Sequence, residues 1–263
     1  LTRLACQVSI AGFVGKDYHG KSLLEKLRAR GIDGAGLIPT DRPTTTKLRV
    51  IGGHQQMLRL DFEESAAVTG KEAEHFLAGI YKKLDEGLDC LIISDYGKGA
   101  CTEENCQKII AACKAHHVPV IVDPKGTNWM KYAGADYITP NLKEINVVLP
   151  DPIRNEDQPV ETAARSVMKK YQLGSLIVTR SEAGLSLICE GEIKHIPTKA
   201  QEVFDVSGAG DTVIAVFAMG IAGDIAPVAS AYLANLAAGV VVAKLGTYAV
   251  SREELLKALE KEK

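Results

Sequence analysis

The chain alternates short β-branched runs with longer stretches in which apolar residues recur at helical spacing. Residues 8–14 predict a strand, and the stretch after them predicts a helix that ends at Gly31. The alternation continues, with strands expected at residues 90–94, 118–122, 135–139 and 175–179 and a crossover helix over residues 102–116. This pattern is typical of a largely parallel sheet that helices cover on both faces.

The last third of the chain departs from this alternation. Apolar runs at residues 184–189 and 192–197 flank Glu190-Gly191 and predict a hairpin. Three helices are expected after it, at residues 208–221, 227–244 and 251–261. Residues 150–159 are polar and bounded by prolines, which indicates a surface loop.

One segment alternates with the period of a strand on both sides of Gly52-Gly53. In its first half, Leu48 and Val50 fall on one face, while Lys47 and Arg49 fall on the other. The glycine pair is a hairpin signal, so residues 40–64 predict an antiparallel ribbon inserted into the α/β core. The cationic face favours the interpretation that this ribbon is a lid that closes over a binding site. The alternative is an exposed ribbon whose charges only keep it soluble.

Composition narrows the functional classes. The chain has 263 residues and a formal net charge of −2, which suits one domain over residues 1–263 and gives no charge pattern for binding nucleic acid or anionic membranes. No apolar run is long enough to cross a bilayer. The six cysteines form no Cys-x-x-Cys pair, which is typical of reduced thiols in a cytoplasmic protein. The histidines are expected in solvated loops and helix ends.

The segment Gly208-Ala209-Gly210-Asp211 stands directly before a predicted helix. Glycines allow a ligand to approach the backbone closely, and the free N–H groups of a first helical turn bind anions. Asp211 is placed beside such an anion, where it can accept a proton from an attacking hydroxyl group. Phosphoryl transfer needs this combination of donors and base. Taken alone, the segment is also compatible with an ordinary helix start.

Residues 205–211, Asp-Val-Ser-Gly-Ala-Gly-Asp, resemble the signature of the ribokinase-like (pfkB) carbohydrate kinases. Other family motifs are matched in order by Asp123-Pro124, by Asn141 with Glu144, by residues 178–184, and by residues 234–235 and 244–247. The resemblance implies a ribokinase-like three-layer α/β/α fold with a mostly parallel central sheet and a small antiparallel β lid. It also implies ATP-dependent phosphorylation of a sugar with Mg²⁺. Whether a monovalent cation takes part is left open.

The resemblance also implies roles for single residues. Asp211 is the expected base, and the backbone N–H groups of Gly208, Ala209 and Gly210 are the expected anion site. Asn141 and Glu144 are expected to hold Mg²⁺ through water, although an N-cap with a supporting acid explains the same pair. The expected ATP contacts are Lys125, Asn141, Thr179, Ser181, Gly184 and Asn235. Ser181 departs from the family pattern, which usually has glycine at that position.

Further stretches, including Thr46-Lys-Leu-Arg49 and Asp95-Tyr-Gly-Lys-Gly99, resemble the branch of the family that phosphorylates D-glycero-D-manno-heptose 7-phosphate. Those kinases form half of bifunctional ADP-heptose synthases and make the 1,7-bisphosphate for the lipopolysaccharide core. The implied substrate contacts are Lys47, Arg49, Gln56, Arg59, Asp95 and Lys98. Fixed cations on the lid independently favour a phosphorylated sugar, since a phosphomonoester requires them.

Two other interpretations remain. The chain could phosphorylate another sugar or sugar phosphate, such as fructose 1-phosphate. It could also be a catalytically incomplete nucleotide-binding or oligomerisation module, with the ribbon as a dimer interface; a homodimer through the lid is expected in either case. Kinases of this family usually begin with a strand and a Gly-Gly element that are not found before Leu1. About fifty further residues are therefore expected upstream, judged from typical domain size.

Overall fold

The computed structural model describes residues 1–53, 55–198 and 203–262. After a short 3₁₀ turn, the chain forms β1 (Val8–Gly15), α1 (Tyr18–Ala29) and β2 (Ile32–Thr40). Strands β1 and β2 pair in parallel and form a small sheet of their own. Asp17 begins α1 as its N-cap, accepting a hydrogen bond from the Gly20 N–H group at 2.8 Å.

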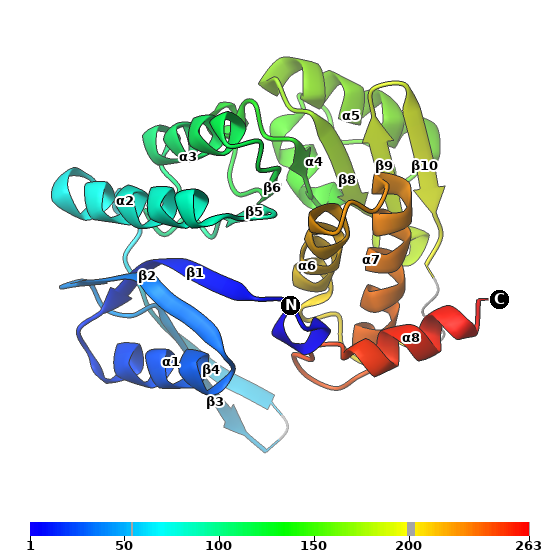
Figure 1. Ribbon diagram of the computed structural model, residues 1–263. Coiled ribbons are helices and arrows are strands. Elements are labelled where there is room, and N and C mark those ends of the chain that lie inside the picture. The colour runs from blue at the N-terminus through cyan, green and yellow to red at the C-terminus, as the bar shows by residue number, and fades with distance from the viewer. Residues whose placement is uncertain (54, 199–202, 263) are drawn as a thin grey trace.

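A six-stranded sheet organises the rest of the chain (Figure 1). Its spatial order is β10-β9-β8-β7-β6-β5. Strands β5 to β8 run parallel, whereas β9 and β10 form the antiparallel hairpin at one edge. The bounds are β5 (Leu91–Ser94), β6 (Val120–Asp123), β7 (Tyr137–Ile138), β8 (Ser175–Thr179), β9 (Leu185–Cys189) and β10 (Glu192–Ile196). The largely parallel sheet and its terminal hairpin are confirmed, but β1 and β2 stand outside this sheet.

Helices cover both faces of the six-stranded sheet, so the architecture is the expected three-layer α/β/α sandwich. Residues alternate between two cores along each strand: Val120 and Val122 of β6 join one core, and Ile121 joins the other. The first core is closed by α2 (Gly70–Glu86), α3 (Glu103–Ala115), α4 (Leu142–Val148) and α5 (Asp157–Tyr171). The second is closed by α6 (Ala209–Ala222), α7 (Pro227–Val242) and α8 (Arg252–Glu260).

Helices α6 and α7 pack closely because Gly220 of α6 faces Ser230 of α7. A Cβ atom at Gly220 would lie 2.3 Å from the Ser230 Oγ atom and 2.7 Å from its Cβ, which is too close for any side chain. Ser230 is fully buried and donates a hydrogen bond to the Ile225 carbonyl at 3.1 Å. The spacing of the two helices is therefore fixed at backbone contact.

The lid ribbon consists of β3 (Thr46–Gly52) and β4 (Gln55–Phe62), which pair in antiparallel. Leu48 lies opposite Leu60, and Arg49 lies opposite Arg59, so the ribbon has one apolar face and one charged face. The apolar face is exposed to solvent and consists of Leu48, Val50, Leu58, Leu60 and Phe62. His54, at the turn, lies outside the described residues.

The sequence pattern misses some elements. Strand β2 lacks a clear signal because Gly34, Gly36 and Pro39 interrupt its apolar pattern. Helix α2 is also not predicted, whereas the start of α4 agrees with the N-cap interpretation of Asn141. Helix α5 begins at Asp157, inside the stretch expected as a loop, because Pro159 in a first helical turn gives up no hydrogen bond. Among the described residues, no helix combines the length and hydropathy that a membrane crossing requires.

Candidate active site

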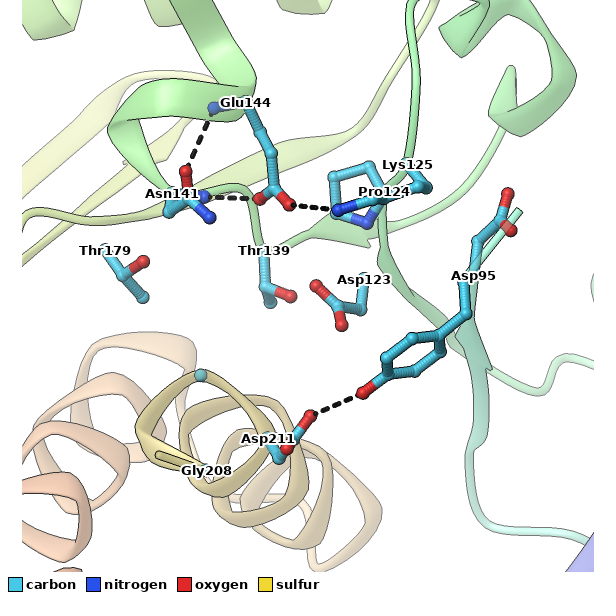
Figure 2. A pocket seen from close by; sticks show the side chains of 12 residues that line it. Asp95, Asp123, Pro124, Lys125, Thr139, Asn141, Glu144, Thr179, Gly208 and Asp211 are labelled. Atoms are coloured by element: carbon cyan, nitrogen blue, oxygen red, sulfur yellow. Dashed lines mark hydrogen bonds and ion pairs between the residues drawn. The ribbon is translucent and has the colours of Figure 1, made fainter. Parts of the chain in front are cut away.

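A polar pocket lies where the parallel strands of the six-stranded sheet end (Figure 2). Asp95, Asp123 and Thr139 follow or close β5, β6 and β7 at their carboxyl ends, and Thr179 closes β8. Ligands collect at this edge of open α/β sheets. The pocket is completed by the first turn of α6 and by the start of α4. Its lining residues are Asp95, Tyr96, Asp123, Pro124, Lys125, Thr139, Asn141, Glu144, Thr179, Gly208, Gly210 and Asp211.

The glycine-rich segment enters α6 through Gly208, which is the helix N-cap and has a φ of +81°. This left-handed conformation favours glycine and turns the first N–H groups of α6 toward the pocket. Ala209 differs from its predicted role: its N–H group donates to the Val206 carbonyl at 3.2 Å, and it does not line the pocket. Within the described residues, the N–H groups of Gly208, Gly210 and Asp211 have no acceptor and are available to an anion.

Asp205, the first residue of the signature, holds this segment in place. Its carboxylate accepts hydrogen bonds from the N–H groups of Ser207 at 2.8 Å and Gly246 at 3.1 Å. The hydrogen bonds to Ser207 are the main cause that holds the pKa of Asp205 below its usual value. The signature therefore combines a residue that shapes the loop, Asp205, with one that faces the pocket, Asp211.

Asp211 lies on the first turn of α6 and points across the pocket (Figure 2). Its Oδ1 atom accepts a hydrogen bond from the Tyr96 hydroxyl group at 3.2 Å. The two residues are 115 positions apart in the sequence, and nothing in the linear pattern indicates this contact. Asp123, which matches a family motif in the sequence, and Thr139, which the sequence motifs do not single out, also line the pocket at the ends of their strands.

Asn141 and Glu144 form a capping box at the start of α4. The Asn141 side chain accepts from the Glu144 N–H group, and Glu144 Oε2 accepts from the Asn141 N–H group, both at 2.9 Å. Glu144 Oε1 remains directed to the pocket, 3.9 Å from Lys125 Nζ. The N-cap interpretation is thus correct as local structure, and it leaves one carboxylate oxygen for another partner.

These residues fit Mg²⁺ as an ion held largely by water and nucleotide phosphates. Among the described residues, no three acidic, histidine or cysteine side chains gather closely enough to hold a metal ion by themselves. Mg²⁺ commonly binds through one or two carboxylates and keeps several waters. Glu144 Oε1 and the carboxylate of Asp123 face the same pocket and supply that donor set.

Asp123 has a pKa raised to about 7, first because of burial and then because of the nearby charges of Glu144 and Asp211. The unfolded chain ionises this group near pH 4, so the native state loses stability as the pH rises from about 4 to 7. Asp123→Asn is therefore expected to stabilise the metal-free protein increasingly between pH 5 and pH 8, by on the order of 2 kcal/mol at pH 8. Urea unfolding at each pH measures this. A gain that does not change with pH would contradict it, and Asp151→Asn on a surface loop is the control.

The turn after β8 is held by Arg180, which is 3% exposed. Its guanidinium group donates to Asn155 Oδ1 at 2.9 Å, Asp157 Oδ1 at 2.6 Å and Ser186 Oγ at 2.9 Å. His195 of β10 joins this network through Ser186 Oγ at 2.8 Å. The expectation that the histidines are solvated is therefore wrong for His195, which is half-buried because it pairs with these groups.

Two of the predicted ATP residues shape this turn and do not line the pocket. Ser181 has a φ of +52°, a conformation that explains why glycine is usual at its position. Gly184 has a φ of +80°, and a Cβ atom there would lie 2.1 Å from the Ile196 carbonyl oxygen. Asn235 of α7 is buried, and its side chain donates to the Pro197 carbonyl at 2.8 Å.

The predicted substrate residues fall into two groups. Asp95 lines the pocket, but its carboxylate is buried and bound by the Gly97 N–H group at 2.6 Å, by the Tyr132 hydroxyl at 2.7 Å and by Lys131. Its oxygens therefore hold the loop after β5, which differs from the substrate contact predicted for Asp95. Lys98 pairs with Glu63 at 2.6 Å and ties this loop to the base of the lid.

The lid cations differ in their partners. Lys47 pairs with Glu63 at 2.9 Å, and Arg59 pairs with Asp61 at 3.0 Å. Arg49, on the same face, makes no ion pair with any described residue. Gln56 is exposed near the turn of the ribbon. The charged face is thus mixed in sign, and Arg49 is the cation most available to an anionic ligand.

Comparison with known proteins shows the family of the chain. A family model described as pfkB family carbohydrate kinase matches residues 1–254. The chain is 40% identical over its whole length to a protein named Bifunctional protein HldE from Trichlorobacter lovleyi, and 43% identical over 99% of its length to one so named from Pseudomonas fluorescens. It covers 53% and 54% of those proteins, so it spans about half the length of the curated relatives it matches.

Solved structures resemble the fold at low sequence identity. The ribokinase of Arabidopsis thaliana, complexed with ribose and ATP, aligns over 98% of this chain and 84% of its own with a TM-score of 0.80 at 20% identity. Phosphofructokinase-2 of Escherichia coli, in complex with potassium, covers 98% of this chain and 83% of its own with a TM-score of 0.81 at 15% identity. With a family model matched over nearly the whole chain and this ribokinase-like fold, the chain belongs to the pfkB family of carbohydrate kinases.

Proposed function

We propose that this chain transfers the γ-phosphoryl group of ATP to the anomeric hydroxyl of D-glycero-D-manno-heptose 7-phosphate, giving the 1,7-bisphosphate used for ADP-heptose and the lipopolysaccharide core. The observation that carries the kinase assignment is Asp211 beside the unpaired N–H groups of Gly208 and Gly210, in one pocket with Lys125. The choice of sugar rests on the sequence resemblance of residues 46–49 and 95–99 and on the relatives named HldE.

In the proposed mechanism, Asp211 accepts the proton of the anomeric hydroxyl as that oxygen attacks the γ-phosphorus and the bond to the ADP oxygen breaks. The N–H groups at the start of α6 donate to the oxygens of the transferring group, where negative charge is concentrated. Lys125 extends over the pocket and suits contact with the ATP phosphates. Mg²⁺, when bound near Asn141 and Glu144, neutralises part of the ATP charge. In-line transfer then needs only positioning and these charges.

An ADP-release assay with a panel of neutral and phosphorylated sugars tests the substrate class. Arg49→Gln is expected to raise KM for the sugar phosphate about tenfold with kcat little changed, because one charge-assisted contact with the phosphate is lost. Arg165→Gln, on the exposed surface of α5, is the matched control. Preferred turnover of neutral sugars, or an unchanged KM in the Arg49 variant, would contradict a phosphate-binding lid.

We also propose that two copies of the chain pair through the lid. The apolar face of the ribbon is unusually open, with Phe62 53% exposed and Leu60 39% exposed. An exposed apolar strand pair is normally covered in a stable protein. Leu60→Asp is expected to shift the protein to a monomer in light scattering after gel filtration. The control is Asp61→Asn, which changes a charge on the opposite, charged face of the ribbon and leaves the apolar face as it is.

The alternative function, a nucleotide-binding module without catalysis, makes a different prediction in the same assay. It would bind ATP but release no ADP with any sugar in the panel. The uncommitted donors of the α6 turn and the free oxygen of Asp211 favour catalysis, because a binding module has no use for a base at that place. The assignment to the cytoplasm follows from the ATP requirement and stays part of this proposal.

A further inference from the structure

We propose that Tyr96 is a positioning residue for the reaction: its hydroxyl group holds one oxygen of Asp211 so that the other faces the sugar hydroxyl. The inference rests on the proposed role of Asp211 as the base. It begins from the hydrogen bond between the Tyr96 hydroxyl and Asp211 Oδ1, at 3.2 Å across the pocket (Figure 2). No other side chain of the described residues contacts the Asp211 carboxylate within hydrogen-bonding distance.

The backbone around Tyr96 is held firmly. Asp95, next to it, is 4% exposed, and its Oδ1 atom accepts the Gly97 N–H group at 2.6 Å, which closes a tight turn around Tyr96. The other oxygen of Asp95 is bound by Tyr132 at 2.7 Å and by Lys131. Tyr132 is fully buried and also accepts the Lys125 N–H group at 3.0 Å. The phenol of Tyr96 thus extends into the pocket from a rigid loop.

The hydroxyl group of Tyr96 is suited to donate a hydrogen bond to Asp211. Partial burial, and then the charge of Asp211, raise the pKa of Tyr96 above its usual value, so the hydroxyl keeps its proton throughout the neutral range. A carboxylate that accepts one hydrogen bond loses rotational freedom about its last torsion angle. Oδ1 is then occupied by Tyr96, and Oδ2 remains as the acceptor for the sugar proton. A base held in this way meets the geometric requirement of general base catalysis.

A substrate contact is the rival role for Tyr96, since the side chain is 59% exposed and lies in the pocket. The two roles differ in their dependence on Asp211. A residue that acts through Asp211 matters only while Asp211 acts as the base. A residue that binds the sugar by itself contributes equally with or without that carboxylate.

The test is a double-mutant cycle with Tyr96→Phe and Asp211→Asn, measured as single-turnover phosphoryl transfer from ATP to heptose 7-phosphate, with kcat and KM taken from steady-state ADP release. Tyr96→Phe is expected to lower the rate about tenfold, the effect of one hydrogen bond to a charged group, with both KM values within twofold of the parent. In the Asp211→Asn background, the same change is expected to have no further effect. Tyr18→Phe, an exposed tyrosine on α1, is the control for removing a hydroxyl group.

Each outcome decides a separate point. An equal loss in both backgrounds, a raised KM for the sugar at unchanged kcat, or no loss at all would overturn the positioning role of Tyr96. If Asp211→Asn itself keeps full activity, the proposed base is wrong, and this failure is distinct from a failure of Tyr96 alone. Because Tyr96 is largely exposed, the Phe variant is expected to fold as the parent does, which circular dichroism and urea unfolding verify.

Discussion

Asp211→Asn is expected to lower kcat by about 10³-fold while leaving KM for ATP nearly unchanged. Asparagine has nearly the same shape as aspartate but cannot accept a proton, so the pocket is expected to keep its form and lose the proposed base. Asp211 lies in the first turn of α6, where its side chain is exposed and does not pack in a hydrophobic core. The measurement is steady-state ADP release, with ATP binding followed separately by isothermal titration calorimetry.

Two controls make this result specific. Asp224→Asn, just beyond the far end of α6, removes a carboxylate of similar exposure away from the pocket and is expected to leave kcat unchanged. The unfolding free energy of Asp211→Asn is expected to equal that of the parent. Activity within a few-fold of the parent in Asp211→Asn would rule out proton abstraction by this carboxylate.

Lys131→Met is expected to destabilise the fold by about 3–5 kcal/mol, because it leaves the buried carboxylate of Asp95 without its counter-charge. The side chain of Asp95 is 2% exposed and that of Lys131 is 14% exposed, so water cannot replace the lost partner. Methionine keeps most of the aliphatic volume, which limits the effect to the charge. Urea unfolding monitored by tryptophan fluorescence gives the change in unfolding free energy.

The double variant Asp95→Asn/Lys131→Met separates the charge effect from packing. With no charge left in the cluster, most of the lost stability is expected to return. A double variant as unstable as Lys131→Met alone would show that the loss comes from packing. The exposed pair Lys108 and Glu104 on α3 offers a comparison, since Lys108→Met there is expected to cost well under 1 kcal/mol.

Those parts of the fold and the site that depend on residues close together in the sequence could be predicted from it. Residues 205–211 form one turn and the start of α6, so their order alone places Gly208 and Asp211 beside each other. The capping pair Asn141 and Glu144 is likewise three residues apart on one helix. Strands β5 to β8 contribute side chains to both cores, and the short apolar runs that this requires allowed the strands to be predicted.

The rest depends on contacts between distant segments. Tyr96 meets Asp211 only because β5 and α6 end at the same edge of the sheet, and no local pattern contains that information. The hydrogen-bond network of Arg180 is not predicted, since its partners lie in other segments: Asn155 in the loop before α5, Asp157 at the start of α5 and Ser186 on β9. The alternation of apolar and charged residues predicted the two faces of the lid. The ion pairs of Lys47 and Arg59 with acidic neighbours, however, depend on the structure of the paired strands β3 and β4.

The contact between Gly220 and Ser230 has a consequence for how the rate could be altered. Helix α6 carries Asp211 at one end and Gly220 toward the other, and α7 presses on Gly220 with no room for a methyl group. A larger residue at position 220 is expected to push α6 away from α7 and so to shift Asp211, at the other end of α6, relative to the strand ends. Position 220 does not line the pocket, so a substitution there is a route to slow variants in which every pocket residue keeps its identity and only the placement of Asp211 changes.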